Sequence, residues 1–508
     1  MTILNVASAL LLVSASLASP AVSESRKDIS IAAPWEVTSY DTAVSGFAFQ
    51  RLGVMENLVD ADANGKLLPA LATDWISNED GTQWTFKIRE DVSFHDGSEF
   101  NAITAAKALN EALVKPGILK KAPITKIYEK NGSVVVKLER QFAALPSILA
   151  HYTAIIPAPA SFDGEGAPVA AIGTGPFIVG TFTPPQGMTL KRNEAYWGEA
   201  PKLEEASYLA AGRAETRTLL AESGDADLVF TLDPSGFAHL ADVDSVETQA
   251  VPIPRVVTLK VNAGHKFLSD VRARQALSMA IDRKGIATAI TRFPEAAATQ
   301  LFPPALGKWH SDNISNLETN VEQARENLAA LGWVVANDGV LERDGERFSI
   351  LLRTFPDRPE LPLIAAVLQD QWKSIGVELE VSVANYSEIP AGHKDGTLHV
   401  ALYARNYGLT PDPIGTIASD FGPGGAEWGA MGYENATVVE RLNKIAATPN
   451  VATKTEDIEA VVKLLNTELP IIPIVWYQHT VSVAKGLEGF VVDPLERDYG
   501  LAKIRWAE

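Results

Sequence analysis

The sequence predicts an α/β fold with more than one lobe. A chain of 508 residues is too long for a single hydrophobic core, so several domains or subdomains are expected. Segments of strand and helix character alternate through residues 256–484, which favours an α/β unit with a largely parallel sheet. No low-complexity linker separates the parts, so continuous strands should join the lobes.

Composition and charge exclude several classes of protein. With 46% hydrophobic and 21% charged residues, the chain is typical of a globular protein. Its formal charge of 44 − 63 = −19, without any basic run, argues against nucleic-acid binding. The sequence contains no cysteine, which excludes disulfides, thiolate metal sites, a cysteine nucleophile and the cysteine-linked lipid anchor of bacterial lipoproteins.

Residues 1–23 have the layout of a secretory signal peptide. An apolar core, Val6–Val13, leads into small residues around Ala18 and Ala21. The first residues carry no lysine or arginine, so an uncleaved anchor is the competing interpretation, although the apolar core is short and interrupted by serine. We expect a periplasmic protein that is exported without a lipid anchor.

Hairpin signals dominate the first third of the chain. The polar cluster Asn78–Gly81 precedes the alternating strand Gln83–Arg89, and an Asn-Gly pair marks the tip of a hairpin over Ile127–Glu139. Asn101 is a suitable N-cap for a helix over Ala102–Val114. This region should therefore form a small antiparallel sheet with one helix.

The second half of the chain alternates between the two kinds of element. Strands are expected at Val256–Val261, Phe348–Thr354, Val377–Val383, Leu398–Tyr403, Ile471–Ala484 and Phe490–Val492. Helices are expected at Asp270–Asp282, Val321–Leu331, Leu361–Ile375, Val438–Ala447 and Thr455–Glu468.

Five motifs extend over most of the mature chain. They are LLPALATDWISNEDGTQWTFKIREDVSFHDGSEFNA (Leu67–Ala102), GTGPF (Gly173–Phe177), KRNEAYWG (Lys191–Gly198), TLKVNAGHKFLSDVRARQALSMAIDR (Thr258–Arg283) and DQWKSIGVELEV (Asp370–Val381). Each is weak alone, but their order and spacing are specific. With them the sequence resembles the extracytoplasmic solute-binding proteins of peptide/nickel-type ABC importers, bacterial extracellular solute-binding protein family 5.

The resemblance implies a two-lobed periplasmic binding protein, or "Venus flytrap", with an extra subdomain in the first lobe. The first lobe would comprise 24–255 plus 486–508, with the extra subdomain at about 68–183, and the second lobe 256–485. A small-molecule ligand would bind in the interlobe cleft, and hinge closure would follow. A membrane ABC permease would recognise the closed form, and the protein would act as a monomer.

The residues themselves give no sign of catalysis. The chain contains no Gly-x-Ser-x-Gly elbow, no His-Glu-x-x-His and no phosphate-binding loop, and the turn at Gly173–Gly175 precedes a strand rather than a helix. None of the eight histidines has a second histidine three or four residues away, so no metal site is expected. We expect no catalytic residues and no cofactor; a secreted hydrolase is the alternative from another class.

Arg405 lies where the apolar run Leu398–Ala404 ends, with Asn406, Tyr407 and Asp412 close behind. The resemblance implies that this segment lines the ligand pocket. A guanidinium can hold a carboxylate with two hydrogen bonds, and Tyr407 can stack on a planar or apolar ligand group. The alternative is a structural ion pair between Arg405 and Asp412 or another carboxylate.

Asn406 shifts the expected ligand from peptide to carboxylate. Peptide binders of the family place an aspartate near this strand end for the peptide ammonium, whereas Asn406 is neutral. Arg405–Gly408 with Asp412 is closer to the nickel-type members, which bind metal as a chelate with small organic carboxylates. The sequence departs from those members in having no histidine in 421–433 and no arginine in 150–157.

Four further residues complete the predicted ligand site. Arg51 is either an exposed helix residue or a second clamp for anions, and His151 follows an apolar run where family members carry cleft residues. Trp428 is either a packing anchor of its glycine-rich loop or a platform for the ligand, and Asp412 either pairs with an arginine or accepts a ligand ammonium. The expected solute is a metal chelate, an opine-like compound or a peptide-like compound, with an ordinary oligopeptide or a sugar as alternatives.

Overall fold

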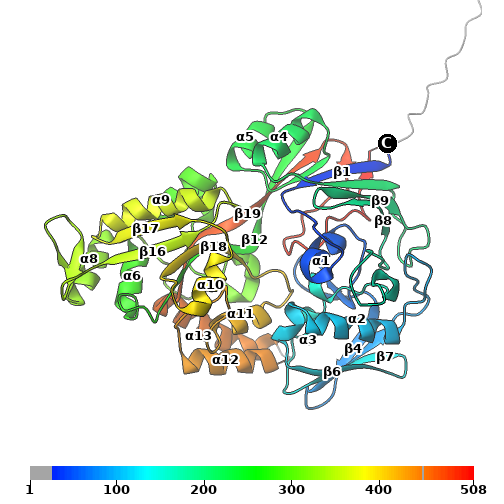
Figure 1. Ribbon diagram of the computed structural model, residues 1–508, viewed down its shortest axis with the longest axis horizontal. Helices are drawn as coiled ribbons and strands as arrows, with labels where there is room; N and C mark the ends of the chain where they lie inside the picture. Colours follow the sequence, from blue (N-terminus) through cyan, green and yellow to red (C-terminus); the bar gives the residue numbers. More distant parts are fainter. Residues whose placement is uncertain (1–25, 449–450, 508) are drawn as a thin grey trace, which may run out of the picture.

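A ten-stranded sheet runs through the whole molecule (Figure 1). The computed structural model describes residues 26–448 and 451–507, so the predicted signal peptide lies outside the described residues. The strands follow the order β17-β16-β18-β12-β19-β11-β1-β10-β9-β8. Their bounds are β1 (Asp28–Ala33), β8 (Phe177–Thr183), β9 (Gly187–Arg192), β10 (Glu205–Ala210), β11 (Leu228–Phe230), β12 (Val246–Val261), β16 (Ser349–Thr354), β17 (Glu378–Val383), β18 (Val400–Asn406) and β19 (Ile471–Ala484).

Two long strands, β12 and β19, join the two halves of this sheet. Residues 246–252 of β12 pair antiparallel with the end of β19, residues 256–260 pair with its beginning, and the register shifts between Pro252 and Val256. Strand β18 joins β12 only from Arg255 onward. The crossover between the halves therefore lies at residues 252–256.

The sheet is mixed, not largely parallel as the sequence predicted. Strands β17, β16 and β18 are parallel to one another, but β12 is antiparallel to both β18 and β19. The alternation of strands and helices cannot reveal this arrangement, because the two crossing strands pair with each other across more than 200 residues of sequence.

A second, four-stranded sheet of order β4-β5-β7-β6 forms the hairpin-rich region as predicted. It contains β4 (Ala72–Ser77), β5 (Gln83–Ile88), β6 (Ile124–Lys130) and β7 (Ser133–Leu138), and it packs against helix α2 (Ala102–Val114), whose bounds match the predicted helix. The Asn101 side chain caps α2 by accepting from the backbone N–H groups of Ile103 and Thr104. Short elements complete this region: β2 (Val59–Ala61), β3 (Leu67–Pro69), η1 (Ile118–Lys121), α3 (Leu145–Ile148), η2 (Tyr152–Ala154) and η3 (Pro159–Ser161).

Helices cover both halves of the large sheet. The half that contains β1 carries α1 (Thr42–Arg51), α4 (Ala214–Ser223) and α5 (Pro234–Leu240). The half that contains β16 carries α6 (Val271–Met279), α7 (Arg283–Ile286), α8 (Val321–Ala330), α9 (Glu360–Lys373) and α10 (Glu388–Asp395), with α9 packed on β16, β17 and β18. Minor elements there are η4 (Ala287–Thr291), η5 (Pro294–Ala296), η6 (Pro304–Trp309), β13 (Val334–Val335), β14 (Leu341–Arg343) and β15 (Glu346–Arg347).

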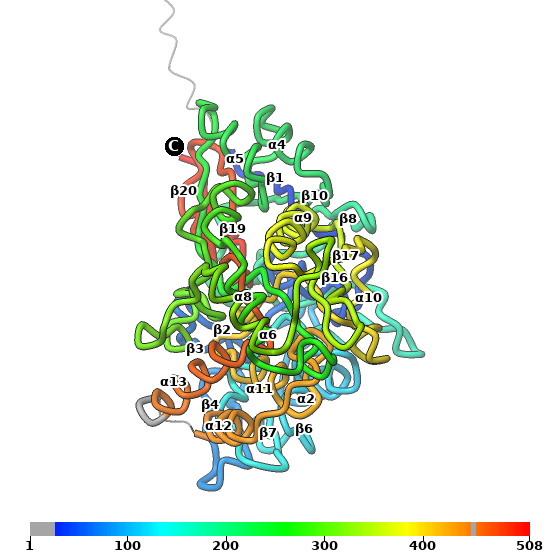
Figure 2. Tube along the Cα trace, turned by 90° about the vertical axis from the view of Figure 1, so that its left-hand side faces the viewer, coloured from blue at the N-terminus to red at the C-terminus, as the bar shows by residue number. Residues whose placement is uncertain are grey.

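Helices α11 (Ile414–Phe421), α12 (Ala436–Ala447) and α13 (Val451–Glu468) lie beside the four-stranded region, as both views show (Figures 1 and 2). The backbone N–H of Ala143 donates to the carbonyl of Ala446 at 2.8 Å, and Phe142 and Ile148 share one hydrophobic cluster with Ile417. Segments distant in sequence therefore pack together and join the four-stranded region to α11 and α12.

Several predicted elements differ from the observed ones in extent, and one does not form; strand β18, predicted at Leu398–Tyr403, runs to Asn406 and so includes Arg405. The helix expected over Asp270–Asp282 ends at Met279, because Asp282 caps the next helix through the N–H of Gly285. The strand expected at Phe490–Val492 does not form; the Phe490 ring packs on Phe230 instead, and the nearby paired strands are β20 (Leu487–Glu488) and β21 (Arg505–Trp506). Among the described residues, no helix is both long and apolar enough to cross a membrane.

Candidate functional site

A cavity of about 890 Å³ lies where the two halves of the large sheet face each other. Trp35 and Asp233 follow β1 and β11 of one half, and Phe355 follows β16 of the other. In open α/β sheets ligands bind outside the carboxyl ends of strands, and small-molecule pockets have volumes of roughly 300–1,000 Å³. The position and size of this cavity are those of a small-molecule site.

Arg358 brings a positive charge to the cavity wall. It lies four residues after the end of β16, and its Nη1 donates to the Tyr477 hydroxyl at 3.0 Å, with the guanidinium 5.3 Å from the Tyr477 ring centre. No carboxylate among the described residues lies within ion-pair distance of Arg358; burial alone would lower its pKa, but Tyr477 and the more distant charges of Glu360 and Glu496 raise it. A guanidinium in this state can receive a carboxylate through its remaining N–H groups.

The other charged side chains of the cavity wall differ in how many of their hydrogen-bonding groups already have partners within the protein. Arg217 donates to the backbone carbonyls of Ala211, Gly212 and Thr231, and Asp233 caps α5 through two backbone N–H groups. Glu360, in contrast, has a buried Oε1 with no hydrogen-bond partner among the described residues. Arg358 and Glu360 are thus a cation and a carboxylate of the cavity wall whose hydrogen-bonding capacity is largely unused.

Aromatic rings give the cavity its apolar walls. Phe355 lies on the wall and makes edge contacts with Trp428 and Tyr386, with ring centres 6.4 Å apart in both cases. Trp35 lines the opposite side and stacks under the guanidinium of Arg51 at 4.5 Å. Such surfaces suit an apolar or planar group of a solute.

Arg405 is held in an ion pair. Its Nε and Nη2 donate to the two carboxylate oxygens of Asp420 at 2.7 and 2.6 Å, and the Asp420 side chain is fully buried. Burial alone would lower the pKa of Arg405, but the charge and hydrogen bonds of Asp420 raise it. The partner in this pair is Asp420 rather than Asp412.

Tyr407 lies beneath Arg405 and inside the protein. Its side chain is 1% exposed, the ring makes an edge contact with Phe302 at 5.2 Å, and its hydroxyl has no hydrogen-bond partner among the described residues. Burial, reinforced by the charge of Asp420, raises its pKa well above the ordinary value. In this arrangement the ring packs against protein.

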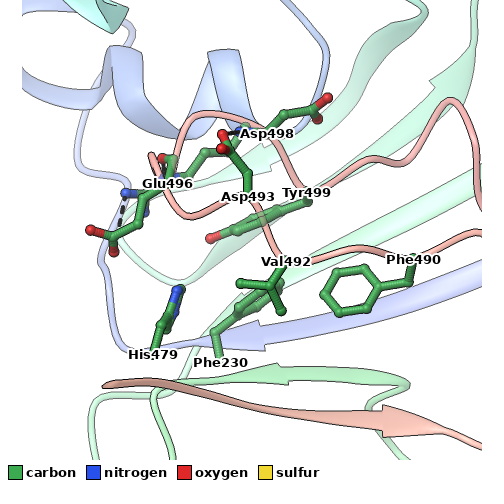
Figure 3. A pocket seen from close by; sticks show the side chains of 9 residues that line it. Phe230, His479, Phe490, Val492, Asp493, Glu496, Asp498 and Tyr499 are labelled. Carbon is green, nitrogen blue, oxygen red and sulfur yellow. Dashed lines mark hydrogen bonds and ion pairs between the residues drawn. The ribbon is translucent and has the colours of Figure 1, made fainter. Parts of the chain in front are cut away.

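The structure brings Asn406 and Arg51 together at one residue, Glu496. Asn406 Nδ2 donates to Glu496 Oε2 at 2.7 Å, while Arg51 Nε donates to the backbone carbonyl of Glu496 at 2.7 Å. Arg51 is buried and not an exposed helix residue, and it lines a second cavity of only about 10 Å³ together with Glu496 and His479 (Figure 3).

The remaining predicted residues serve local structure. Asp412 accepts from the backbone N–H of Ile414 and lies 3.4 Å from Nζ of Lys454, so its cationic partner is a lysine. His151 is buried, its Nδ1 accepts from the N–H of Thr153, and burial lowers its pKa to about 3.

Trp428 belongs to the glycine-rich loop that the sequence singled out. Its backbone carbonyl accepts a hydrogen bond from the Tyr403 hydroxyl, and its ring contacts Tyr403 and Phe355. The buried Lys260 donates to the carbonyl of Glu427 at 2.8 Å, which fixes the same loop from below. Trp428 thus stands directly behind the cavity wall formed by Phe355.

None of the seven predicted ligand residues lines the 890 Å³ cavity, which is lined instead by Arg358, Tyr477, Trp35 and Phe355 among others. The sequence contained a usable signal for Arg358, because it follows the predicted strand Phe348–Thr354 as Arg405 follows Leu398–Tyr403. It contained none for Trp35 or Tyr477, whose role depends on the pairing of distant strands. Within the described residues, no group of three or more histidine, aspartate or glutamate side chains is arranged to hold a metal ion.

Comparison with known proteins assigns the chain to a family. The model described as "Bacterial extracellular solute-binding proteins, family 5 Middle" matches residues 66–428. The chain belongs to this family. Family 5 membership confirms the resemblance seen in the five motifs, and it makes the chain a member of a group of solute-binding transport proteins.

Individual members of family 5 are distant in sequence but similar over almost the whole chain. The nickel-binding periplasmic protein of Escherichia coli (strain K12) is 23% identical over 473 residues, 90% of each chain. The glutathione-binding protein GsiB of the same strain is 23% identical over 459 residues, 86% of each chain. The crystal structure of NikA from Brucella suis in complex with Fe(III)-EDTA has a TM-score of 0.84 at 20% identity and covers 94% of this chain and 99% of its own.

The likeness to solved structures confirms the predicted fold class, an α/β two-lobed periplasmic binding protein. In a family 5 protein of this fold, the 890 Å³ cavity is the space between the two lobes. We call the half with β1 the first lobe and the half with β16 the second lobe.

Proposed function

We propose that this protein is the substrate-binding component of an ABC importer that captures a small carboxylate-bearing solute in the 890 Å³ interlobe cavity and delivers it to a membrane permease. The observation that carries the proposal is Arg358, a guanidinium on the cavity wall with no carboxylate partner among the described residues. It takes the role that the sequence assigned to Arg405, whose charge Asp420 already balances.

The cavity chemistry narrows the solute. Arg358 would hold its carboxylate, the ring of Phe355 or Trp35 would contact an apolar or planar part, and Glu360 would accept from a donor group. A metal chelate, an opine-like compound and a peptide-like compound each carry such groups. If a metal is part of the ligand, its organic carboxylates would contact the protein, since the described residues offer no cluster of metal ligands.

In this proposal the residues that the sequence predicted to bind the ligand act indirectly, by supporting the cavity wall or the structure around it. Arg405 retains a partly exposed side chain, at 17%, and Trp428 supports the wall at Phe355. Arg51 and Asn406 would act through Glu496 rather than on the solute. Tyr407, His151 and Asp412 would act by packing and loop structure.

The organisation of the chain completes the proposal. The first lobe would comprise 24–255 plus 486–508, with the extra subdomain at 68–183, and the second lobe 256–485. The protein would capture the solute by closing its lobes about residues 252–256, without covalent chemistry. The exported protein would act as a monomer.

Native mass spectrometry of the purified protein tests this function directly. We expect a bound solute that is released on denaturation and carries at least one carboxylate. Titration calorimetry should then give tight binding of that solute and at least a tenfold weaker binding of its amide or ester, because a neutral group cannot form the charged hydrogen bonds of Arg358. Equal affinity for the acid and its amide would contradict the carboxylate assignment, and turnover of the solute would support the hydrolase alternative.

A further inference from the structure

We propose that Glu496 is a positioning residue that ties the two lobes together and thereby sets the balance between the observed arrangement and more open ones. The carboxylate belongs to the C-terminal segment of the first lobe, and it binds the strand end at which the second lobe begins. The inference concerns the movement of the lobes and does not depend on which solute binds.

The segment around Glu496 is fastened to the first lobe on the C-terminal side of the glutamate. Arg497 pairs with Asp60 at 2.8 Å and donates to the carbonyl of Ala61 at 2.6 Å, and the N–H of Tyr499 donates to the carbonyl of Arg51 at 3.0 Å. The backbone of Glu496 itself accepts from Arg51 Nε at 2.7 Å. These contacts fix the position from which the carboxylate extends.

The carboxylate binds the ladder pair at the crossover, which joins Arg255, the last residue of the first lobe, to Asn406 of the second lobe. Its Oε2 accepts from Arg255 Nη2 at 2.6 Å and from Asn406 Nδ2 at 2.7 Å. Arg255 and Asn406 are direct partners in the β12–β18 ladder, and they form the first pair after the register shift that begins at Pro252. One oxygen of Glu496 therefore binds both members of the ladder pair at the crossover, and its bond to Asn406 joins the two lobes.

Burial makes this contact strong and specific. The Glu496 side chain is 1% exposed and faces the guanidinium groups of Arg255 and Arg51, and His479 lies beside it (Figure 3). Burial alone would raise the pKa of Glu496, but the charges of Arg255, His479 and Arg51 lower it to about 2, so the tie stays ionised at ordinary pH. Glu496 also has a backbone φ of +55°, a conformation unfavourable for a residue with a side chain, which its surroundings must hold.

A rotation of the second lobe about residues 252–256 would pull Asn406 away from Glu496, because β18 moves with the second lobe while residues 493–499 stay with the first. The tie therefore favours the observed arrangement of the lobes. Its loss should populate more open arrangements even when no solute is present.

The absence of cysteine from the chain allows a direct test. Labels attached through Ser223→Cys at the end of α4 and Ser374→Cys after α9, both exposed, would report the distance across the cavity walls. Pulsed electron paramagnetic resonance on the full chain without solute should give one main distance. In Glu496→Gln the fraction of molecules with a longer distance between the two labels should be at least fivefold larger than in the parent protein.

Two further variants make the outcome decisive. Asn406→Ala removes the hydrogen bond to Glu496, together with the local one that Asn406 Oδ1 accepts from the N–H of Gly408, and it leaves no buried charge unpaired. It should therefore fold and show the same longer-distance population to a smaller extent. Glu488→Gln changes an exposed carboxylate paired with Arg505 in the same C-terminal region, and it should leave the distances unchanged. If Glu496 had only a local structural role, its replacement would lower the melting temperature without altering the distances.

Unchanged distances in both Glu496→Gln and Asn406→Ala would overturn the inference, and if Glu496→Gln does not fold, Asn406→Ala alone decides. Because no solute is used, this result is independent of whether the carboxylate assignment of the cavity holds.

Discussion

Arg405 and Arg358 are associated with neighbouring strands of the same sheet, yet they have opposite environments. Arg405 lies in β18, one residue before its end, and gives two hydrogen bonds to the buried carboxylate of Asp420. Arg358 follows β16 and faces the cavity, and the Tyr477 hydroxyl is its one hydrogen-bond partner within the described part of the chain. A charged residue at a strand end is therefore not by itself a ligand contact. What distinguishes the two arginines is whether another part of the chain supplies the counter-charge.

The largest expected effect is a loss of stability when the ion pair between Arg405 and Asp420 is broken. Asp420→Ala leaves a buried guanidinium without its carboxylate, and removing one partner of a buried ion pair costs about 3–5 kcal/mol. Urea unfolding should show that loss, while Asp312→Ala, whose side chain is fully exposed, should change stability by less than about 0.5 kcal/mol. A small loss for Asp420→Ala would mean that Arg405 does not depend on Asp420 and remains available to a ligand.

A second effect concerns His479, which lines the small second cavity beside Glu496 and has no hydrogen-bond partner for either ring nitrogen among the described residues. Burial, partly opposed by Glu496, lowers its pKa to about 4 in the folded state, below about 6.5 in the unfolded chain. Its contribution to stability is therefore complete above pH 6.5 and is lost as the pH falls through 4, by up to about 3 kcal/mol.

His479→Phe should remove this pH-dependent part of the free energy of unfolding, because a phenyl ring has no proton to gain or lose. The variant should lose less stability than the parent protein between pH 6.5 and 4 in urea unfolding. His239→Gln, at an exposed position, should follow the parent curve. If His479→Phe and the parent protein have parallel curves, His479 does not titrate in that range.

The third effect separates the two arginines by affinity. Arg358→Ala should weaken binding of the co-purified solute about 100-fold, as expected when a carboxylate loses a buried charged partner, and it should change stability by less than about 1 kcal/mol. Arg405→Ala should show the reverse, with stability falling by several kcal/mol because Asp420 is left unpaired. Calorimetry and urea unfolding of both proteins would check the contrast, with the exposed Arg272→Ala as a control. If Arg358→Ala binds the solute with unchanged affinity, Arg358 does not hold its carboxylate, and Arg405 becomes the candidate for that contact again.

The smallest effects come from the two tyrosines beside these arginines. Tyr477→Phe removes the hydroxyl that positions Arg358, so affinity should fall about fivefold, in line with one hydrogen bond of about 1 kcal/mol. Tyr407→Phe removes a buried hydroxyl that has no partner among the described residues, so the free energy of unfolding should stay equal or rise by up to about 1 kcal/mol. A clear loss of affinity in Tyr407→Phe would show that its ring and hydroxyl meet the solute.

Local signals in the sequence predicted much of the secondary structure. Asn101 and the apolar spacing of Ala102–Val114 gave both ends of α2, and the long apolar run Ile471–Ala484 is strand β19 over its full length. The predictions failed where partners were distant. The mixed direction of the large sheet depends on β12 pairing with β19, and Phe490–Val492 packs its side chains without joining a sheet.

The sequence by itself determined the family, the α/β two-lobed fold and the presence of a positive charge at the end of a second-lobe strand, because motifs, periodicity and residue type are local properties. Only the tertiary structure decided that Arg405 is balanced by Asp420, that Arg358 faces the cavity and that Glu496 reaches Arg255 at the crossover and Asn406 in the other lobe. The physical reason is that a charge acts according to its neighbours in space. Glu496 lies 241 residues from Arg255 in the chain, and no local pattern carries that information.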